Sequence, residues 1–189
     1  MTDVTVDPAV AGLISACTTL LFASAAIHKL RDLRRFDEIF VAYGLIPLPA
    51  SWRLSWGVPI LEALVAVGLL LGPVRTTAVS IGIALLLAYA AAIAVNLSRG
   101  RRDLACGCGG PDERRPIAVW MVWRNILIAS VLAVVMLPWS SRPLGATDGV
   151  TIGCGAVACA LVYLCLDRLL GRTGPLSAQL RISQTGSSS

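Results

Sequence analysis

Long apolar runs separated by short polar connections dominate the chain. A helix needs about 20 apolar residues to cross the hydrocarbon core of a bilayer. Five runs have about that length, one interrupted only by Glu62 and another only by Arg124. The predicted spans cover about residues 8–28, 54–74, 76–98, 116–138 and 149–167. The pattern predicts an all-α integral membrane protein with a single transmembrane domain, 1–172, and a polar disordered tail, 173–189.

Composition agrees with membrane insertion, and charge suggests an orientation. Of the 189 residues, 56% are hydrophobic and 14% charged, whereas soluble domains carry about 25% charged residues. The net charge of +5 therefore indicates membrane topology, and we expect the lipid bilayer as partner and no nucleic acid. Thirteen of the sixteen basic residues fall on one side of the predicted spans. The positive-inside rule then places the N-terminus outside a cell (inner or plasma) membrane, with the C-terminus and loop 99–115 in the cytoplasm.

The first connection contains an amphipathic segment. Phe36, Ile39, Phe40 and Tyr43 follow helical spacing beside charged residues. This pattern predicts a short interfacial helix, and the favoured interpretation is a connector that rests on lipid headgroups.

Polar residues inside the spans form a predicted layer. Glu62 and Arg124 each lie eight residues into spans that enter from the same side, so both sit about 10 Å deep. An acid and a base at equal depth on neighbouring helices are expected to pair. The predicted layer comprises His28, Glu62, Asn96, Arg124 and Asn125. It is either a salt bridge that fixes helix packing or a pocket that binds a substrate, a quinone or a reacting thiol.

Loop 99–115 carries the candidate reactive groups, Cys106 and Cys108. A disulfide across one intervening residue is a tight ring, and strained disulfides are easily reduced. Gly107 permits the backbone angles that such a closure demands, and the surrounding arginines favour thiolate. The pattern is typical of thiol–disulfide exchange. A glycine-rich turn with two incidental cysteines and Cu(I) handling remain alternatives, while a structural zinc site lacks ligands, so no resident metal is expected.

The other four cysteines, Cys17, Cys154, Cys159 and Cys165, fall inside apolar runs. Cysteine in that setting behaves as a small hydrophobe. Since Cys17, Cys154 and Cys159 are also scattered along the chain, they are poor candidates for a second reactive pair.

Several segments resemble the MauE branch of the DoxX-like membrane proteins over about residues 8–137. The matching segments are "HKLRD", "AYGLIP", "PILEALVAVGLLLG", "AIAVNLSRGRRDLACGCGG" and "WMVWRNILIA". The resemblance implies a DoxX-like four-helix transmembrane bundle, here with a fifth C-terminal span. It also implies a role in methylamine utilisation, in maturation of the disulfide-rich methylamine dehydrogenase, with a thioredoxin-like partner and quinone-linked chemistry. Cys106 and Cys108 correspond to the redox pair, and His28, Glu62, Arg124 and Asn125 follow the shared pattern.

The leading hypothesis is a membrane thiol–disulfide redox protein, with oxidoreductase activity as an open question. Its expected partner is a thioredoxin-like protein or a disulfide-containing client, and its candidate cofactor is a quinone. A non-catalytic membrane scaffold that docks a partner protein is the main alternative.

Overall fold

The structure is a computed structural model of residues 1–189, and it describes all of them except 1–5, 46, 108–115, 139, 141 and 186–189. Side chains 48–50 and 170–185 are also outside the described part. The described residues form helices α1 (Pro8–Arg31), α2 (Leu33–Ala42), α3 (Leu48–Leu70), η1 (Gly72–Val74), α4 (Arg75–Ser98), α5 (Val119–Ala133), η2 (Val134–Met136) and α6 (Ala146–Thr185).

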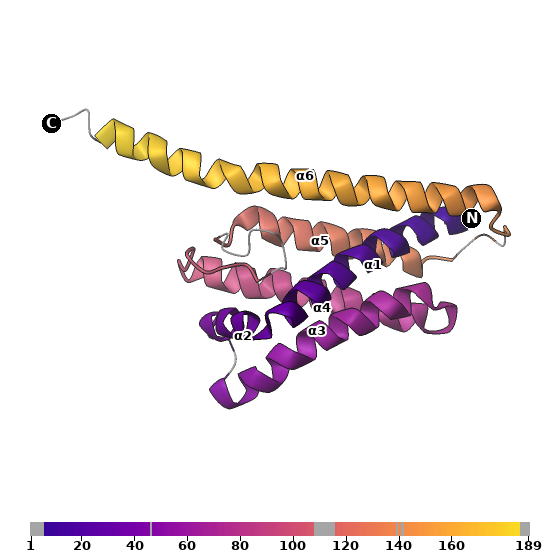
Figure 1. Ribbon diagram of the computed structural model, residues 1–189, viewed down its shortest axis with the longest axis horizontal. Coiled ribbons are helices and arrows are strands. Elements are labelled where there is room, and N and C mark those ends of the chain that lie inside the picture. The colour runs from indigo at the N-terminus through magenta and orange to yellow at the C-terminus, as the bar shows by residue number, and fades with distance from the viewer. Residues whose placement is uncertain (1–5, 46, 108–115, 139, 141, 186–189) are drawn as a thin grey trace, which may run out of the picture.

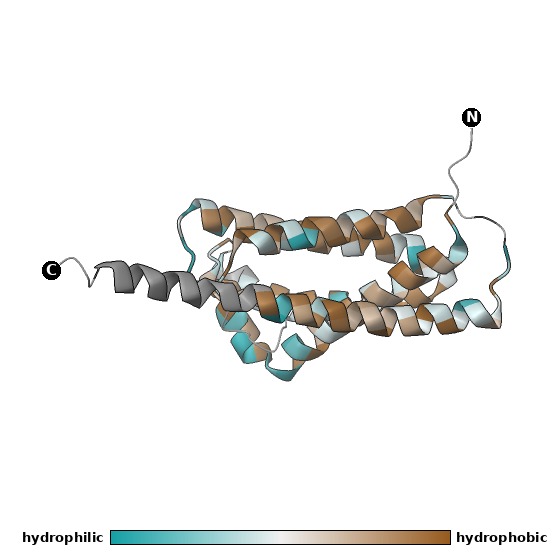
Figure 2. Ribbon diagram, turned by 90° about the horizontal axis from the view of Figure 1, so that it is seen from above, coloured by the Kyte–Doolittle hydropathy of each residue, from teal (hydrophilic) through white to brown (hydrophobic). Residues whose placement is uncertain are grey.

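Five of these helical segments are long and apolar enough to cross a membrane, which confirms the predicted all-α membrane fold. The segments in the described residues are Pro8–Arg31, Ser51–Leu70, Gly72–Ser98, Val119–Met136 and Ala146–Leu169. Figure 2 shows apolar residues along most of their length and polar residues gathered toward the two ends. The helix α6 continues to Thr185, into the segment that the composition predicts to be disordered.

Local signals account for several helix ends. Asp7 caps α1 by accepting the amide of Ala9 at 2.8 Å, and a proline occupies the first turn. Asp32 separates α1 from α2 and caps the second helix by accepting the amide of Arg35 at 3.1 Å. Each cap satisfies a backbone donor that has no partner within its own helix. The first helix therefore extends to Arg31, three residues past its predicted end.

The helices pack as a bundle with α6 along one side (Figure 1). The first helix packs against α3 and α6, while α4 packs against α3 and α5. The core lies between α1, α3, α4 and α5, and includes Phe22, Val65, Leu86 and Leu132. Gly82 belongs to this seam, because a Cβ there would lie 3.2 Å from Leu132 and 3.3 Å from Phe22. A small residue lets the helices approach closely.

The two ends of the bundle differ in their contents. The N-terminus, the α3–α4 turn and the α5–α6 connection lie at one end, and α2 and the α4–α5 connection lie at the other (Figure 1). The helix α2 confirms the predicted short helix, but its apolar face points inward. Phe36 and Tyr43 are buried, and both line the cavity described below. This face therefore packs onto the bundle, and the interpretation of α2 as a connector that rests on headgroups stays a prediction.

Candidate functional site

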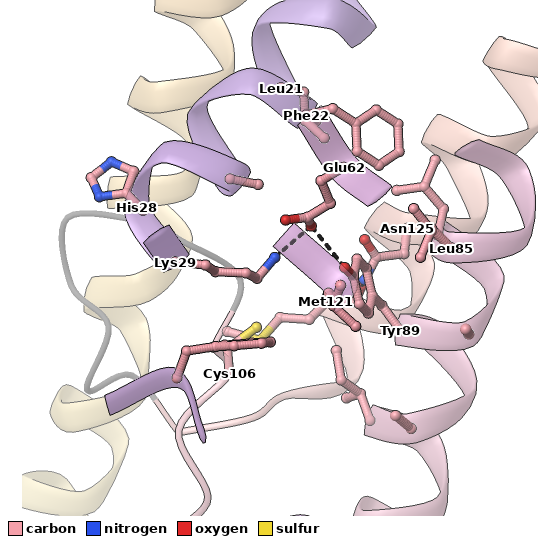
Figure 3. Close-up of a pocket in the computed structure, with 18 of the residues that line it drawn as sticks. Leu21, Phe22, His28, Lys29, Glu62, Leu85, Tyr89, Cys106, Met121 and Asn125 are labelled. Carbon is pink, nitrogen blue, oxygen red and sulfur yellow. Dashed lines mark hydrogen bonds and ion pairs between the residues drawn. The ribbon is translucent and has the colours of Figure 1, made fainter. Parts of the chain in front are cut away.

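A cavity of about 440 Å³ opens at the end of the bundle that holds α2. All six α-helices and the segment around Cys106 contribute to its walls. Most of the lining is aliphatic or aromatic, with a few polar groups among them (Figure 3). Mostly apolar walls with a few placed polar groups are typical of small-molecule sites.

The deepest polar group in the cavity is an ion pair between α1 and α3. Lys29 Nζ lies 2.5 Å from Glu62 Oε1, and the two side chains are only 4% and 1% exposed. The hydroxyl of Tyr89 donates to the same carboxylate oxygen at 2.7 Å. Lys29 Nζ also lies 5.3 Å and 5.1 Å from the ring centroids of Phe36 and Tyr89. The lysine is thus held by one carboxylate and two aromatic rings.

A second ion pair crosses from α5 to α6. Arg124 Nη1 donates to Asp167 Oδ1 at 3.1 Å, and these side chains are 16% and 14% exposed. The guanidinium carbon of Arg124 lies 5.2 Å and 5.9 Å from the rings of Trp120 and Tyr163. The arrangement repeats that of the lysine, with a carboxylate and two aromatic rings around one cation.

These two pairs correct the predicted ion pair between Glu62 and Arg124. Both residues line the cavity, but each has a different partner, Lys29 for the acid and Asp167 for the arginine. Depth along a helix follows from residue counting, whereas the direction of a side chain around the helix does not. The predicted pairing rested on equal depth alone, because the sequence does not give the direction in which each side chain points.

Lys29 was missed as a site residue, although the sequence holds a signal for it. Phe22, Ala25, Ala26 and Lys29 follow the spacing i, i+3, i+4, i+7 of one helix face, and all four are buried. A lysine that continues a buried stripe is expected to face a counter-charge. Its position after the last apolar residues favoured the simpler interpretation of a topology charge.

Two buried polar atoms in the cavity lack a partner among the described residues. They are Glu62 Oε2, an acceptor, and Arg124 Nε, a donor. A buried polar atom without a hydrogen bond costs about 1–3 kcal/mol. Both residues line the cavity, and these two atoms are unsatisfied polar groups buried in its wall.

The remaining predicted layer residues separate into two groups. His28 and Asn125 line the cavity, although His28 points away from the Lys29–Glu62 pair in Figure 3. Asn125 donates to the carbonyl of Met121 at 3.0 Å.

Asn96 is buried but is absent from the cavity lining. It accepts a hydrogen bond from Arg101 at 3.2 Å, and Arg101 also donates to the carbonyls of Ala42, at 2.7 Å, and Tyr43, at 3.4 Å. Arg101 therefore holds the α4–α5 connection against the end of α2, and Asn96 supports Arg101, which differs from the predicted place of Asn96 in the polar layer.

Cys106 enters the cavity lining from the α4–α5 connection. Tyr43 donates to the carbonyl of Cys106 at 3.2 Å, and burial raises the pKa of Tyr43 to about 12. Gly107 has a φ of 65°, and a Cβ there would lie 3.0 Å from Ile39 Cγ2. Only glycine adopts that backbone in that space without strain.

Cys108 lies outside the described residues. The sulfur of Cys106 is in a disulfide rather than free, and its partner is also outside the described residues. The pairing of Cys106 with Cys108 stays a prediction. The described residues contain no group of three or more His, Cys, Asp or Glu side chains placed to hold a metal ion.

The fold and the cavity define a multi-pass helical membrane protein with a mainly apolar pocket that holds a few charged groups beside a cysteine-containing connection. Residues 7–138 match the family described as methylamine utilisation protein MauE. The chain belongs to this family.

Curated relatives extend the match over nearly the whole chain. A methylamine utilization protein MauE of Paracoccus denitrificans is 33% identical over 94% of this chain and 96% of its own length. Its namesake from Methylophilus methylotrophus is 32% identical over 87% and 88%, and that from Methylorubrum extorquens is 31% identical over 92% and 95%. No solved structure matches the chain.

Proposed function

We propose that this protein is a membrane thiol–disulfide redox protein of methylamine utilisation, in which Cys106 and Cys108 alternate between dithiol and disulfide. The observation that carries the proposal is the position of Cys106, which lines the same cavity as the buried Lys29–Glu62 pair (Figure 3). The disulfide state of Cys106 and the name shared by the curated relatives also support it.

The charges near the cavity favour the reactive form of the thiols. A thiolate, not a thiol, attacks a disulfide, and neighbouring cations stabilise it. Lys29 and Arg124 contribute cationic groups to the cavity that Cys106 lines. Their carboxylate partners, Glu62 and Asp167, offset part of that charge.

The cavity also fits a lipid-soluble electron acceptor of the quinone class. Its walls are mainly apolar, and Glu62 and Arg124 are among the few charged residues that line it. Such a ring carries oxygens that accept hydrogen bonds when oxidised and donate them when reduced. When bound, a quinone would accept two electrons and two protons.

The chain's residues then have separate roles in the proposed exchange. Closing the disulfide breaks the S–H bonds of Cys106 and Cys108, forms one S–S bond and releases two electrons and two protons. The Arg124 guanidinium would orient an acceptor oxygen, and the Glu62 carboxylate would receive a proton released in the cavity. Lys29 compensates the charge of Glu62 while its carboxylate is ionised.

The physiological partner in this proposal is a thioredoxin-like protein or a disulfide-containing client. The α4–α5 connection is the docking site, because it carries both cysteines. The charge distribution supports a cytoplasmic position for this connection in the proposal. A membrane-impermeant maleimide added to intact cells should then leave Cys106 and Cys108 unmodified, and labelling from outside would contradict this orientation.

Differential alkylation with mass spectrometry on native membranes tests the redox cycle. Cys106 and Cys108 should gain and lose reactivity together as the redox potential is changed, while Cys165 serves as an internal reference. The double variant Cys106→Ser, Cys108→Ser should lose the redox-dependent function, and Cys165→Ser should retain it.

Two outcomes would favour the alternatives. A double serine variant with full activity would contradict the redox cycle and favour a scaffold. Stoichiometric copper on the purified wild-type protein, absent from the double variant, would favour Cu(I) handling.

A further inference from the structure

Two cysteines that are far apart in the sequence meet between α1 and α6. The side chains of Cys17 and Cys159 interact with each other, and both are free thiols. They are poor candidates for a pair from the sequence alone, because their separation along the chain hides their proximity. The proposed Cys106–Cys108 cycle does not use either residue.

The register of the two helices explains the meeting. The helices α1 and α6 run in the same direction (Figure 1). They approach closely at Gly155, where a Cβ would lie 2.9 Å from Leu13 Cδ1. Cys17 follows Leu13 by four residues, and Cys159 follows Gly155 by four. The two thiols therefore lie one helical turn beyond the Leu13–Gly155 contact, in the same seam between α1 and α6. The absence of a side chain at Gly155 lets the two helices come close together here. A disulfide requires such a short distance between the two backbones.

The pair adjoins the cavity. Leu21 lies one turn beyond Cys17 on α1, and Tyr163 lies one turn beyond Cys159 on α6, and both of these residues line the cavity. A molecule in the cavity is thus about one helical turn, ~5 Å, from the thiols. Cys159 is exposed and Cys17 is half-buried, so the pair is also open to lipid-soluble reagents.

We propose that Cys17 and Cys159 are a second redox-active thiol pair, and that their disulfide fastens α6 to α1 beside the cavity. In the oxidation, two S–H bonds break and one S–S bond forms. Two electrons and two protons pass to a lipid-soluble quinone, which becomes the hydroquinone. The quinone as oxidant rests on the proposed function, whereas the pairing of the two thiols does not.

The disulfide would change how α6 is held. Among the described residues, α6 packs against α1 and is tied to α5 through the Arg124–Asp167 pair. Tyr163, Leu164 and Asp167 form the α6 wall of the cavity. A covalent link one turn before this wall would limit its movement, and reduction would restore it. Occupancy of the cavity and the state of the pair would then be coupled.

A full-length chain that retains only Cys17 and Cys159, with the other four cysteines changed to serine, tests the proposal in native membranes. A short-chain ubiquinone analogue serves as the oxidant, and copper phenanthroline serves as a stronger one. After alkylation of the remaining thiols, mass spectrometry of proteolytic fragments should find both thiols lost together and the two peptides joined. Reduction should restore both.

The matched control retains Cys17 and Cys154, so it has the same number of thiols on the same two helices. Cys154 lies five residues before Cys159 and on a different side of α6. The Cys17–Cys159 disulfide should form about tenfold faster than the control disulfide, because the bond needs its two backbones within a narrow range of distances. Equal rates, or disulfides that join two copies of the chain, would overturn the pairing.

The remaining outcomes separate this proposal from the proposed function. If copper phenanthroline forms the disulfide and the ubiquinone analogue does not, the redox step toward quinone is wrong. Peptide mapping of the oxidised wild-type chain repeats the test without any substitution, and failure to find the Cys17–Cys159 peptide there overturns the proposal. Because the two-cysteine chain lacks Cys106 and Cys108, the result obtained with it does not depend on that cycle.

Discussion

The two ion pairs of the cavity are built alike and hold different parts of the protein. Each joins a cation to a carboxylate on another helix, and each cation contacts two aromatic rings. The Lys29–Glu62 pair is nearly inaccessible and joins helices α1 and α3, which pack along their length. The Arg124–Asp167 pair is more exposed and joins α5 and α6, whose described residues make no other close backbone packing.

The Lys29–Glu62 pair is a contact of the bundle core, whereas the Arg124–Asp167 pair mainly holds α6 in place. A buried charge that loses its partner is left in surroundings that cannot solvate it. A partly exposed charge can move toward polar headgroups or water instead. We therefore expect loss of Lys29 to destabilise the whole bundle, and loss of Arg124 to release mainly α6.

The largest effect is expected from Lys29→Met. The substitution keeps an apolar chain of similar length but leaves the Glu62 carboxylate without a cation, at a cost of about 3–5 kcal/mol. Thermal unfolding of the purified protein in detergent should show the loss. The double variant Lys29→Met, Glu62→Leu should recover most of it, because it removes both charges. A single variant as stable as the wild type would contradict the assignment of this pair to the core.

Arg124→Met should cost less, about 1–2 kcal/mol, since interhelical polar contacts in membranes are modest in strength. The loss should be localised. Hydrogen–deuterium exchange should increase in the part of α6 around Asp167 and remain unchanged in α3. Asp167→Asn is the matched partner variant and should produce the same pattern. A uniform increase of exchange in all helices would contradict the assignment of the Arg124–Asp167 pair to holding α6.

Tyr89→Phe should have an intermediate-to-small effect on the buried pair. It removes the hydroxyl that donates to Glu62 Oε1 but retains the ring beside Lys29. Loss of one hydrogen bond to a charged group costs about 1–2 kcal/mol. In the background of Lys29→Met, Glu62→Leu the same substitution should cost almost nothing, and an equal cost in both backgrounds would show that the hydroxyl has another role.

The smallest effect is expected for a third group of ion pairs, which is exposed and lies at the opposite end of the bundle. Arg142 donates to Asp7 at 3.0 Å and to Asp148 at 2.9 Å, which ties the start of α1 to the start of α6. The Arg142 hydrogen bond, with that of the Ala9 amide, lowers the pKa of Asp7 below its ordinary value of 3.8. The bonds to Asp148 and Asp7 raise the pKa of Arg142.

The pH dependence of this cluster follows from the sign of the Asp7 shift. Because the folded pKa lies below the unfolded one, the contribution of Asp7 is present above pH 3.8 and is lost as the pH falls through the folded pKa. Asp7→Asn keeps the helix cap and removes the charge. Unfolding midpoints of wild type and variant should differ slightly at about pH 6 and converge as the pH falls below the folded pKa of Asp7. A difference that persists in acid would exclude the charge as its cause.

Much of the fold was predictable because membrane spans leave a strong mark on a sequence. Every backbone polar group in lipid must be satisfied inside its own helix, so spans are long, apolar and nearly free of charge. Because charged residues are rare inside spans, Glu62 and Arg124 stand out in the sequence as candidate site residues. Both line the cavity, although their partners are not each other.

Lys29 and Asp167 show where prediction from the sequence stops. Both lie near the ends of spans, where charged residues are common and are normally explained by topology or by headgroups. Only the observed α1, which extends to Arg31, turns Lys29 inward. Asp167 becomes part of the site because α6 passes beside α5 at that height.

The sequence by itself determined the number of spans, their order, the gathering of polar residues toward one end and the membership of the chain in its family. These features are periodic or local, so they can be recognised from the order of residues along the chain. Only the tertiary structure decided that Lys29 pairs with Glu62, that Asp167 pairs with Arg124 and that the side chains of Cys17 and Cys159 interact. Such pairings depend on the rotation and register of packed helices, which result from the fit of many side chains at once.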